Sequence, residues 1–426
     1  MVQFGMPNAS GSRQAALPSE RRVLPLLLVL SGGYIAANIG TQGFVAMLPL
    51  VQIDFEITRT QAGLYSSLYY LSATLVAIGS GRFVDRIGPR AGLTVGAGTV
   101  GLVAVLHAVA PAFGMILGLA FVTGIGFSVI TPSVSGSVIR NVFSSRRAGA
   151  MGMVHGVGGT GALVGTMLLP AIGERLGWRP VMVGGGLLAL GIAFVVAIAY
   201  DRLTPDTRPE APAVRRAGQR SFGSVLTDLL SRRAFLAAGI MGIVFGLSVG
   251  GIAGHLALFV SRDLGFSPTL AGIALGLFHV GGVLGQPAWG AVNDRLYRRR
   301  RHAGMLTLAA LAILMELLFA FVLAPADPPF IALAVSSFVL GFFVLGIPAL
   351  YFTAVSEIAP AEDAGMATGI GLVFSRTGIV IGAPLFGLAA DLTGTYARSW
   401  LLLAVATAAL ACIARAFQRG RPGRRS

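Results

Sequence analysis

The sequence predicts an all-α membrane protein with twelve transmembrane helices, arranged as two pseudo-symmetric six-helix bundles. Hydrophobic residues make up 55% of the 426 positions and charged residues only 12%, and the mean hydropathy is +0.79. Soluble globular chains of this length do not show such a balance. The apolar residues gather in long runs, and the second half of the chain repeats features of the first. These observations together indicate the fold class.

The apolar runs are long enough to cross a bilayer as helices. A transmembrane helix needs about 20 apolar residues, and lipid favours helices because they satisfy their own backbone hydrogen bonds. Twelve runs meet this requirement: residues 24–48, 60–81, 91–110, 113–138, 148–172, 180–199, 235–260, 268–290, 303–324, 329–354, 365–389 and 396–414. They are too long and continuous for the strands of a membrane barrel.

The basic residues report how the chain is oriented in the membrane. All of them are Arg. If both termini are cytoplasmic, the tails and loop ends on that side hold most of them, and the opposite side keeps only Arg59, Arg175, Arg179, Arg262 and Arg398. This asymmetry follows the positive-inside rule. The net charge of +15 therefore reports topology, with both termini cytoplasmic, and not a nucleic-acid surface. The first run is interpreted as a span and not as a cleaved signal peptide.

The chain divides into two halves around one long polar break that is rich in Pro and Arg. The predicted parts are a cytoplasmic N-terminal tail (1–20), an N-terminal six-helix bundle (21–200), a cytoplasmic linker (201–233), a C-terminal six-helix bundle (234–418) and a C-terminal tail (419–426). A shift of 209 residues lays Gly290, Asp294 and Arg295 on Gly81, Asp85 and Arg86. The halves therefore look like copies of one unit, an arrangement in which the substrate path lies between the two bundles.

A charged segment, GRFVDRIGPR, joins the second and third runs. Its Gly81, Asp85, Arg86, Gly88 and Arg90 match Gly-x-x-x-Asp-Arg-x-Gly-x-Arg, and the segment resembles the signature between spans 2 and 3 of the major facilitator superfamily. A degenerate copy, GAVNDRLYRR, stands at the corresponding place in the second half. With twelve runs and a central linker, the resemblance covers about residues 20–418. It implies a carrier that works by alternating access, mostly as a monomer.

The spacing of the signature has a physical reading. Gly81 allows a close helix approach, and Gly88 frees the backbone for the turn into the third run. Asp85 lies on the same helix face as Gly81, where an anion can cap the N-terminus of another helix; the resemblance implies that this is the start of span 11. Arg86 and Arg90 are then expected to meet acidic residues before span 11.

Those acidic residues are Glu357, Glu362 and Asp363, and the loop before span 5 is basic, with Arg140, Arg146 and Arg147. Asp294, followed by Arg295, is expected to meet the basic loop. The hypothesis is that both charged segments hold the halves together on the cytoplasmic side when the cavity opens outward. The alternative is that these charges only anchor loops and set topology.

Charges inside the runs mark candidate functional positions, because a charge in the membrane interior is costly. Two are well inside a run: Arg376, about twelve residues into run 365–389, and Glu316, similarly deep in run 303–324. The resemblance implies that span 11 flanks the central cavity and that span 9 lies outside it. Arg376 is therefore the candidate for contacting the substrate, and its planar guanidinium suits a carboxylate. A structural ion pair or a bond to a backbone carbonyl is the alternative role.

Other polar residues in the runs are candidates for the same site. His279 and His155 could donate a hydrogen bond or carry a proton, because imidazole titrates near neutral pH; lone membrane His residues are also often packing residues. Amide, hydroxyl and aromatic groups could line a cavity for a small, partly apolar solute, or simply anchor helix ends. They are Tyr34, Asn38, Thr41, Gln42, Tyr65, Tyr69, Tyr70 and Tyr351.

Several absences narrow the function. The first run has no carboxylate, unlike proton-coupled sugar carriers, and runs 60–81 and 268–290 hold no interior Arg, unlike nitrate carriers. Of the helix 5 signature of drug/proton antiporters, the glycines Gly152, Gly161 and Gly165 are present, but Thr166 replaces the expected Pro. GVGGTG at 156–161 lies in an apolar run with no preceding strand, so it predicts no dinucleotide cofactor. No enzyme chemistry, cofactor or metal site is predicted, and Cys412 is the only cysteine.

The sequence thus predicts a secondary active transporter for a small organic anion, moved with protons or by exchange. The nearest resemblance is to the oxalate/formate and monocarboxylate branch. An efflux carrier for drugs or metabolites is the alternative, and a transport-inactive membrane receptor is a third reading. The expected partners are the solute, protons and the lipid bilayer, with no nucleic acid and a monomeric chain. The absence of Lys indicates a GC-rich genome, and therefore a bacterial inner membrane.

Overall fold

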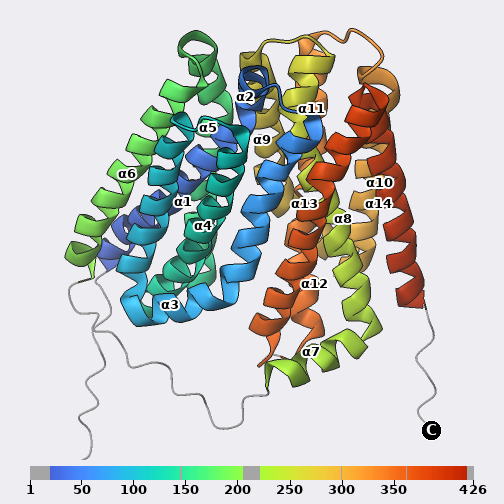
Figure 1. Cartoon of the computed structure of the whole chain (residues 1–426). Helices are drawn as coiled ribbons and strands as arrows, with labels where there is room; N and C mark the ends of the chain where they lie inside the picture. Colours follow the sequence, from blue (N-terminus) through green and yellow to red (C-terminus); the bar gives the residue numbers. More distant parts are fainter. Residues whose placement is uncertain (1–19, 144–145, 205–220, 299, 361, 420–426) are drawn as a thin grey trace, which may run out of the picture.

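A computed structural model of the chain describes residues 20–143, 146–204, 221–298, 300–360 and 362–419. The N-terminal half contains α1 (Glu20–Ala46), α2 (Leu48–Phe55), α3 (Arg59–Ala108), α4 (Phe113–Asn141), α5 (Arg147–Leu176) and α6 (Trp178–Leu203). The C-terminal half contains α7 (Phe222–Ser231), α8 (Arg233–Leu258), η2 (Phe259–Asp263), α9 (Pro268–Leu296), α10 (Arg301–Leu318), η3 (Phe319–Leu323), α11 (Phe330–Val344), α12 (Ile347–Ile358), α13 (Ala364–Thr393) and α14 (Tyr396–Arg419). Figure 1 shows them as two bundles side by side.

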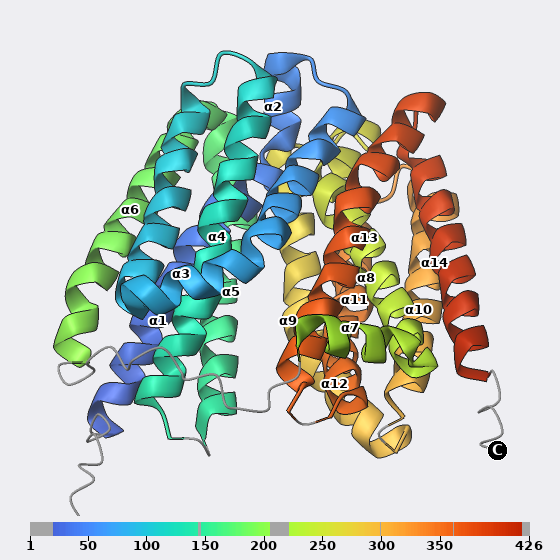
Figure 2. The same cartoon turned by 60° about the horizontal axis from the view of Figure 1, so that its bottom comes forward.

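Helix α3 holds both the second and the third expected span. In the described residues, eleven helical segments are long and apolar enough to cross a membrane, and α3 alone has 50 residues. Run straight, it would be about 75 Å long, more than twice the ~30 Å of a hydrocarbon core. Its backbone is non-helical at Gly88 (φ 84°, ψ 159°), followed by Pro89, and Figures 1 and 2 show the ribbon turning there and running back. The turn expected at Gly88 is therefore confirmed.

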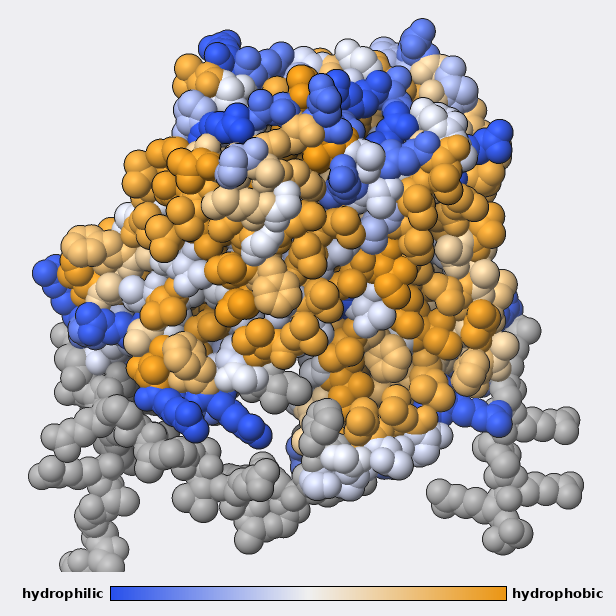
Figure 3. All heavy atoms as spheres, in the orientation of Figure 1, coloured by the Kyte–Doolittle hydropathy of each residue, from blue (hydrophilic) through white to orange (hydrophobic). Residues whose placement is uncertain are grey.

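The two ends of the bundle differ in charge. The start of α1, the end of α14, α7 and the Gly88 turn all lie at one end (Figure 1), which we call the Arg-rich end. The opposite end, the Arg-poor end, carries the connections at 56–58, 264–267 and 394–395. On the face seen in Figure 3, a hydrophobic band crosses the side of the molecule, and hydrophilic residues gather at both ends. The shared end of α1 and α14 agrees with the predicted topology.

Two local features were not expected from the sequence. The break predicted as a linker contains α7, and the Ser221 side chain at its start accepts a hydrogen bond from the Ser224 amide at 3.2 Å. The rest of the predicted linker, residues 205–220, lies outside the described part of the chain, and so do most of both predicted tails. Val225 and Leu229, spaced i, i+4, are fully buried. The tenth run is interrupted between α11 and α12, just before Pro348, because proline cannot continue the hydrogen-bond ladder of a helix.

The halves meet through glycines that leave no room for a side chain. A Cβ on Gly63 of α3 would lie 2.5 Å from the Ala383 carbonyl oxygen of α13, and one on Gly387 of α13 would lie 2.6 Å from the Arg59 carbonyl carbon. On the other flank, a Cβ on Gly272 of α9 would lie 2.7 Å from Pro170 of α5. Small residues permit this close backbone approach in membranes.

Candidate functional site

At the Arg-poor end, a carboxylate of the C-terminal half caps a helix of the N-terminal half. Asp391, near the end of α13, accepts hydrogen bonds from the Arg59 amide (3.0 Å), the Thr60 amide (2.8 Å) and the Thr60 hydroxyl (2.6 Å). These amides belong to the first turn of α3 and have no partner within the helix. An anion there is also favoured by the helix dipole. The contact therefore joins the two halves by capping and by charge.

The Arg59 side chain extends this junction. Its guanidinium pairs with Asp263 at 2.9 Å, donates to the Ala390 carbonyl at 3.0 Å and lies 5.0 Å from the centre of the Tyr396 ring. Asp263 ends the π-helical turn η2 and also accepts the Tyr396 amide at 2.6 Å. Beneath it, fully buried His255 contacts the Tyr396 hydroxyl at 3.0 Å and the Ala383 carbonyl at 2.7 Å. We call Arg59, Thr60, His255, Asp263, Asp391 and Tyr396 the inter-half cluster.

Further contacts between the halves flank the cluster and continue inward. Arg262 donates to the Pro49 carbonyl at 3.0 Å, and Thr269 of α9 donates to Glu174 of α5. Deeper in the molecule, the Ser67 hydroxyl donates to the Val380 carbonyl at 2.7 Å. The halves are thus bonded to each other from the Arg-poor end toward the centre.

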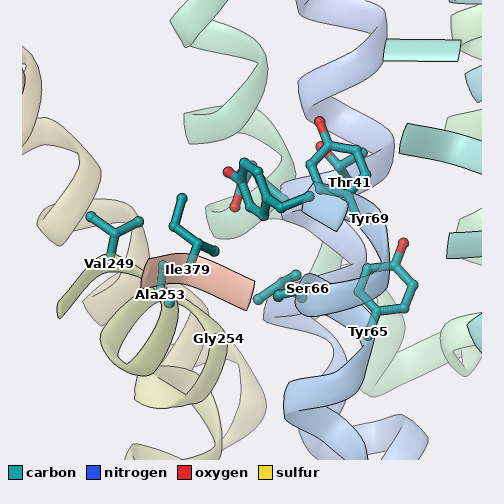
Figure 4. A pocket seen from close by; sticks show the side chains of 12 residues that line it. Thr41, Tyr65, Ser66, Tyr69, Val249, Ala253, Gly254 and Ile379 are labelled. Carbon is teal, nitrogen blue, oxygen red and sulfur yellow. The ribbon is translucent and has the colours of Figure 1, made fainter. Parts of the chain in front are cut away.

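A small pocket lies between the halves below this junction. Helices α1, α3, α8 and α13 line it with Thr41, Gln42, Val45, Tyr65, Ser66, Tyr69, Tyr70, Val249, Gly250, Ala253, Gly254 and Ile379, and Figure 4 shows several of these side chains. It leaves about 20 Å³ for the centre of a water molecule, which is about one water. The path between the halves is therefore too narrow here for an organic solute.

Arg376 lies one helical turn from Ile379 of the pocket, on the side toward the Arg-rich end. It is partly buried, and its Nη1 donates to the Ala73 carbonyl of α3 at 3.1 Å. Among the described residues, no Asp or Glu forms an ion pair with it. At the Arg-rich end, the surface is hollowed between the two halves (Figure 3). Along α13, Arg376 stands between the Arg-rich end and the closed junction.

Five residues expected from the sequence gather with Arg376, namely Tyr34, Gln42, Tyr69, Tyr70 and His155. The guanidinium is close enough to the hydroxyls of Tyr34, Tyr69 and Tyr70 to interact with them electrostatically. Tyr34 donates to Thr131 at 3.0 Å, and its ring lies 4.8 Å from that of His155, which is exposed. The Gln42 amide faces the Tyr70 hydroxyl.

Three predicted residues lie apart from this group. Asn38 donates to the Gly158 carbonyl at 3.2 Å and ties α1 to α5. His279 shares a helix face with Gly272 and Gly276, which contact α5, and its Nε2 is buried without a partner among the described residues. Tyr351 is fully buried inside the C-terminal half and donates to the Gly371 carbonyl at 2.7 Å; its contacts are those of a packing residue.

Comparison with known proteins agrees with this architecture. The family model of the Major Facilitator Superfamily matches residues 30–258 and 238–426. The chain belongs to this superfamily. The membrane sensor protein UhpC of Salmonella typhimurium is 28% identical over 83% of this chain and 82% of its own length. The "Probable sulfoacetate transporter SauU" of Cupriavidus necator is 25% identical over 85% of this chain and 86% of its own.

A solved structure shows the same fold. It is a bacterial homologue of the human lysosomal transporter Spinster in an inward-facing and unoccupied conformation. Its TM-score is 0.77 at 16% identity, over 94% of this chain and 96% of that one. The chain is therefore a multi-pass membrane protein with the fold of superfamily transporters.

The superfamily signature pairs within its own half in this arrangement. Arg90 donates to the Ala197 carbonyl at 2.9 Å and pairs with Asp201 at 2.9 Å, which ties α3 to α6. Asp85 and Arg86 are exposed and, with Gly88, line a hollow beside Tyr200. The expected contact of Arg90 with the loop before α13 is thus replaced by one with α6.

The second copy of the signature behaves in the same way. Asp294 pairs with Arg301 at 2.5 Å, and Arg301 also pairs with Glu357 at 3.2 Å, so Asp294 is bonded inside the C-terminal half and not to the basic loop before α5. Arg295 and Glu362 are exposed, and Asp363 occupies the N-cap position of α13. A Cβ on Gly81 would meet nothing within 4 Å, so the close packing expected there is not needed in this arrangement.

Sequence reasoning missed the inter-half cluster. Arg59 and Arg262 were identified as exceptions to the positive-inside asymmetry, but they were not given a role. The available signal was the occurrence of Asp263 and Asp391 on the same side of the membrane, where opposite charges from two halves can meet. That these residues meet depends on helix packing between the halves, which the linear pattern does not contain.

Proposed function

We propose that the protein is a secondary active transporter that moves a small organic anion across the bacterial inner membrane by alternating access. One observation carries the proposal: Arg376, at the boundary between the hollow and the closed junction, has a backbone carbonyl and no carboxylate as its bonded partner among the described residues. A guanidinium has five N–H donors, and a carboxylate can take two of them in parallel. An unpaired cation at this depth is costly, so an anion that neutralises it binds favourably.

The surroundings of Arg376 fit a monocarboxylate-like solute. Hydroxyls from Tyr34, Tyr69 and Tyr70 face the same region, and the rings offer apolar surface for the body of the solute. Binding sites of this kind combine apolar walls with a few placed polar groups. The similarity to a sulfoacetate transporter supports an anionic substrate.

Alternating access follows if the junction at the Arg-poor end opens while the Arg-rich end closes. The inter-half cluster holds the first end shut in this arrangement, and the signature residues are the candidates for closing the second. Coupling is by protons or by exchange, and the chain works as a monomer. Efflux of drugs or metabolites remains the alternative direction and substrate class.

A second candidate function is ligand sensing without transport. It is favoured by the similarity to the sensor protein UhpC over more than four fifths of both chains. A sensor would bind its anion at the same place but would not carry it through the membrane. Binding and transport must therefore be measured separately.

The first experiment is a thermal-shift screen of the purified protein against sulfoacetate, mono- and dicarboxylates, sugars, amino acids and drug cations. A ligand that binds only the folded state stabilises it by about 2.7 kcal/mol at a hundredfold excess over its dissociation constant. Arg376→Gln is run in parallel, with Arg398→Gln as the control, since Arg398 is exposed at the Arg-poor end. Stabilisation by an anion in the wild type and control, but not in Arg376→Gln, is the expected result.

Uptake of the stabilising anion into proteoliposomes then separates carrier from sensor. A carrier accumulates or exchanges it, whereas a sensor binds it with no flux. Stabilisation by cations or neutral drugs that is unchanged in Arg376→Gln would overturn the anion proposal and favour efflux.

A further inference from the structure

Glu316 is a carboxyl group buried in the membrane-spanning part of the C-terminal half. It lies on α10, seven residues before the end of η3, and has no exposed surface. Its Oε1 accepts a hydrogen bond from Ser248 of α8 at 3.2 Å, and Thr407 of α14 faces the same carboxyl. A π-helical turn, η3, begins three residues later, and such turns are frequent at functional sites. The superfamily resemblance had placed this span outside the cavity, but its carboxyl reaches α8, which lines the central pocket.

The groups around Glu316 fit a neutral carboxylic acid better than a carboxylate. Glu316 Oε2 and Thr407 Oγ1 are both buried, and neither has a hydrogen-bond partner among the described residues. An isolated carboxylate in an apolar interior costs several kcal/mol. A proton on Oε2 removes the charge and supplies a donor that the Thr407 oxygen can accept.

The helices that pack against α10 bring no compensating cation to the carboxyl. Helix α8 offers Ser248 and α14 offers Thr407, and α11 contains no titratable residue. The other titratable groups on the spanning parts of α8, α9, α12 and α14 are His255 and Tyr396, which are bonded to each other, His279, Tyr351, which is bonded to Gly371, and Cys412. The remaining charged residues of these helices stand at their ends: Arg233, Asp294, Arg295, Glu357, Arg398, Arg415 and Arg419.

A short packed route connects Glu316 with the candidate substrate site. Ser248 directly precedes Val249 and Gly250, which line the central pocket. Two residues earlier, Gly246 of α8 packs against α13: a Cβ there would lie 2.8 Å from Gly378 Cα and would also clash with the Ser375 carbonyl. Ser375 and Gly378 flank Arg376. A change at Glu316 that moves Ser248 therefore acts on the helix turn that carries Arg376.

We propose that Glu316, with Ser248 and Thr407, is a proton-binding site coupled to anion binding at Arg376. The inference rests on the proposed carrier function and names its coupling ion. One proton adds to the carboxylate to give the acid, and the same proton leaves on the other side of the membrane, so nothing is oxidised or reduced. A monoanion such as lactate and one proton then cross together with no net charge, whereas a dianion such as sulfoacetate crosses with one proton and one net negative charge.

Infrared spectroscopy tests the proton site without any substrate. The purified protein in lipid nanodiscs is titrated with acid and base, and the C=O stretch of protonated carboxyls is followed in H₂O and D₂O. We expect a band that persists above the pH at which exposed carboxyls ionise and is missing from Glu316→Gln. Glu362→Gln is the matched control, because Glu362 is exposed and its loss should leave the band unchanged. A band that is identical in Glu316→Gln and the wild type would overturn the proposal.

A second variant keeps the test independent of folding defects in Glu316→Gln. Ser248→Ala removes the hydroxyl that donates to the carboxylate, and a hydrogen bond to the charged form favours that form. We therefore expect the acid band of Ser248→Ala to persist to higher pH than in the wild type. An unshifted titration in a folded Ser248→Ala protein would contradict the proposed site.

Transport tests the coupling, with sulfoacetate and lactate as probes. Glutamine imitates the protonated, neutral side chain. We expect Glu316→Gln to lose accumulation driven by a pH gradient but to keep anion exchange, in which no proton needs to dissociate. Accumulation at the wild-type level in Glu316→Gln would overturn the coupling. If the wild type moves neither probe and binds no anion, the carrier proposal fails, while the infrared result on Glu316 stands by itself.

Discussion

Asp391 caps the first turn of α3 from the opposite half of the molecule, through the amides of Arg59 and Thr60 at 3.0 and 2.8 Å. The superfamily resemblance implied the same device at the other end, where Asp85 of span 2 would cap the start of span 11. In the structure the end of span 11 caps the start of span 2. The Thr58–Gln61 capping box satisfies other groups at the start of α3, and Asp391 of the other half accepts from the Arg59 and Thr60 amides, so the two halves share this helix start at the Arg-poor end.

Asp391→Asn should loosen this junction. The amide keeps the shape of the carboxylate but loses the charge that favours the helix N-terminus, and a hydrogen bond to a charged group contributes about 1.5–3 kcal/mol. The measurement is the labelling rate of a cysteine at Ser66, which is buried between α3 and α8, in a Cys412→Ser background. An impermeant reagent added at the Arg-poor side should react faster in Asp391→Asn.

Asp54→Asn is the control for that experiment. Asp54 also lies at the Arg-poor end, but it pairs with Arg179 and Trp178 inside the N-terminal half. Its loss should leave labelling at position 66 unchanged. Equal acceleration by both variants would mean that general loosening of this end, and not the capping contact, controls access.

The Arg59–Asp263 pair should be stronger than the neighbouring Arg179–Asp54 pair. Their side chains are 20% and 9% exposed in the first pair, and 40% and 37% exposed in the second. Exposed pairs contribute about 0–1 kcal/mol, and screening falls as water is excluded. A double-mutant cycle with Arg59→Gln and Asp263→Asn, measured by unfolding in detergent, should give a coupling energy on the order of 1–3 kcal/mol. A value no larger than that of the Arg179–Asp54 cycle would contradict this ranking.

Gly387→Val should separate the halves at the Arg-poor end. A Cβ at Gly387 already lies within 2.6 Å of the Arg59 carbonyl carbon, and backbone atoms cannot move aside as a flexible side chain can. The variant should therefore increase labelling at position 66, as Asp391→Asn does. Gly118→Val is the matched change at an open position of α4 outside the signature and should label like the parent. Unchanged labelling in Gly387→Val would show that the close approach is not required.

Arg376 should be replaceable by lysine only in part. The Arg376→Lys variant would keep the positive charge but not the planar pair of donors that binds a carboxylate in two places. We expect anion affinity to fall about tenfold in Arg376→Lys and about a hundredfold or more in Arg376→Gln, since 1.4 kcal/mol corresponds to a factor of ten. Isothermal titration with the anion from the screen measures both. Equal affinity in all three proteins would assign Arg376 to the structural bond with Ala73.

The fold and the position of Arg376 could be predicted from the sequence, whereas the contacts between the two halves could not. The spans and the Gly88 turn could be predicted because each depends on neighbouring residues alone: a spanning helix needs a long apolar run, and a turn with a positive φ favours glycine. Arg376 could be identified because a buried charge is rare in lipid. The role of Asp391 could not, because an Asp at a helix end looks the same whether or not another helix starts beside it. Tyr351 illustrates the same limit, since a tyrosine in a span gives no sign of facing the cavity or the bundle interior.

Asp85→Arg tests the remaining hypothesis about the signature. In this arrangement Asp85 is exposed at the Arg-rich end, while Asp391 holds the opposite end shut. If Asp85 caps α13 when the cavity opens outward, charge reversal destabilises only that state, because a cation at a helix N-terminus is unfavourable. The labelling rate at position 66 from the Arg-poor side should then fall below that of the parent, the opposite of Asp391→Asn. The control is the reversal of an exposed charge outside the signature, which should have no such effect; Glu362 is unsuitable for this because it lies just before α13. An unchanged labelling rate in Asp85→Arg would mean that the charges of the signature only anchor loops and set topology.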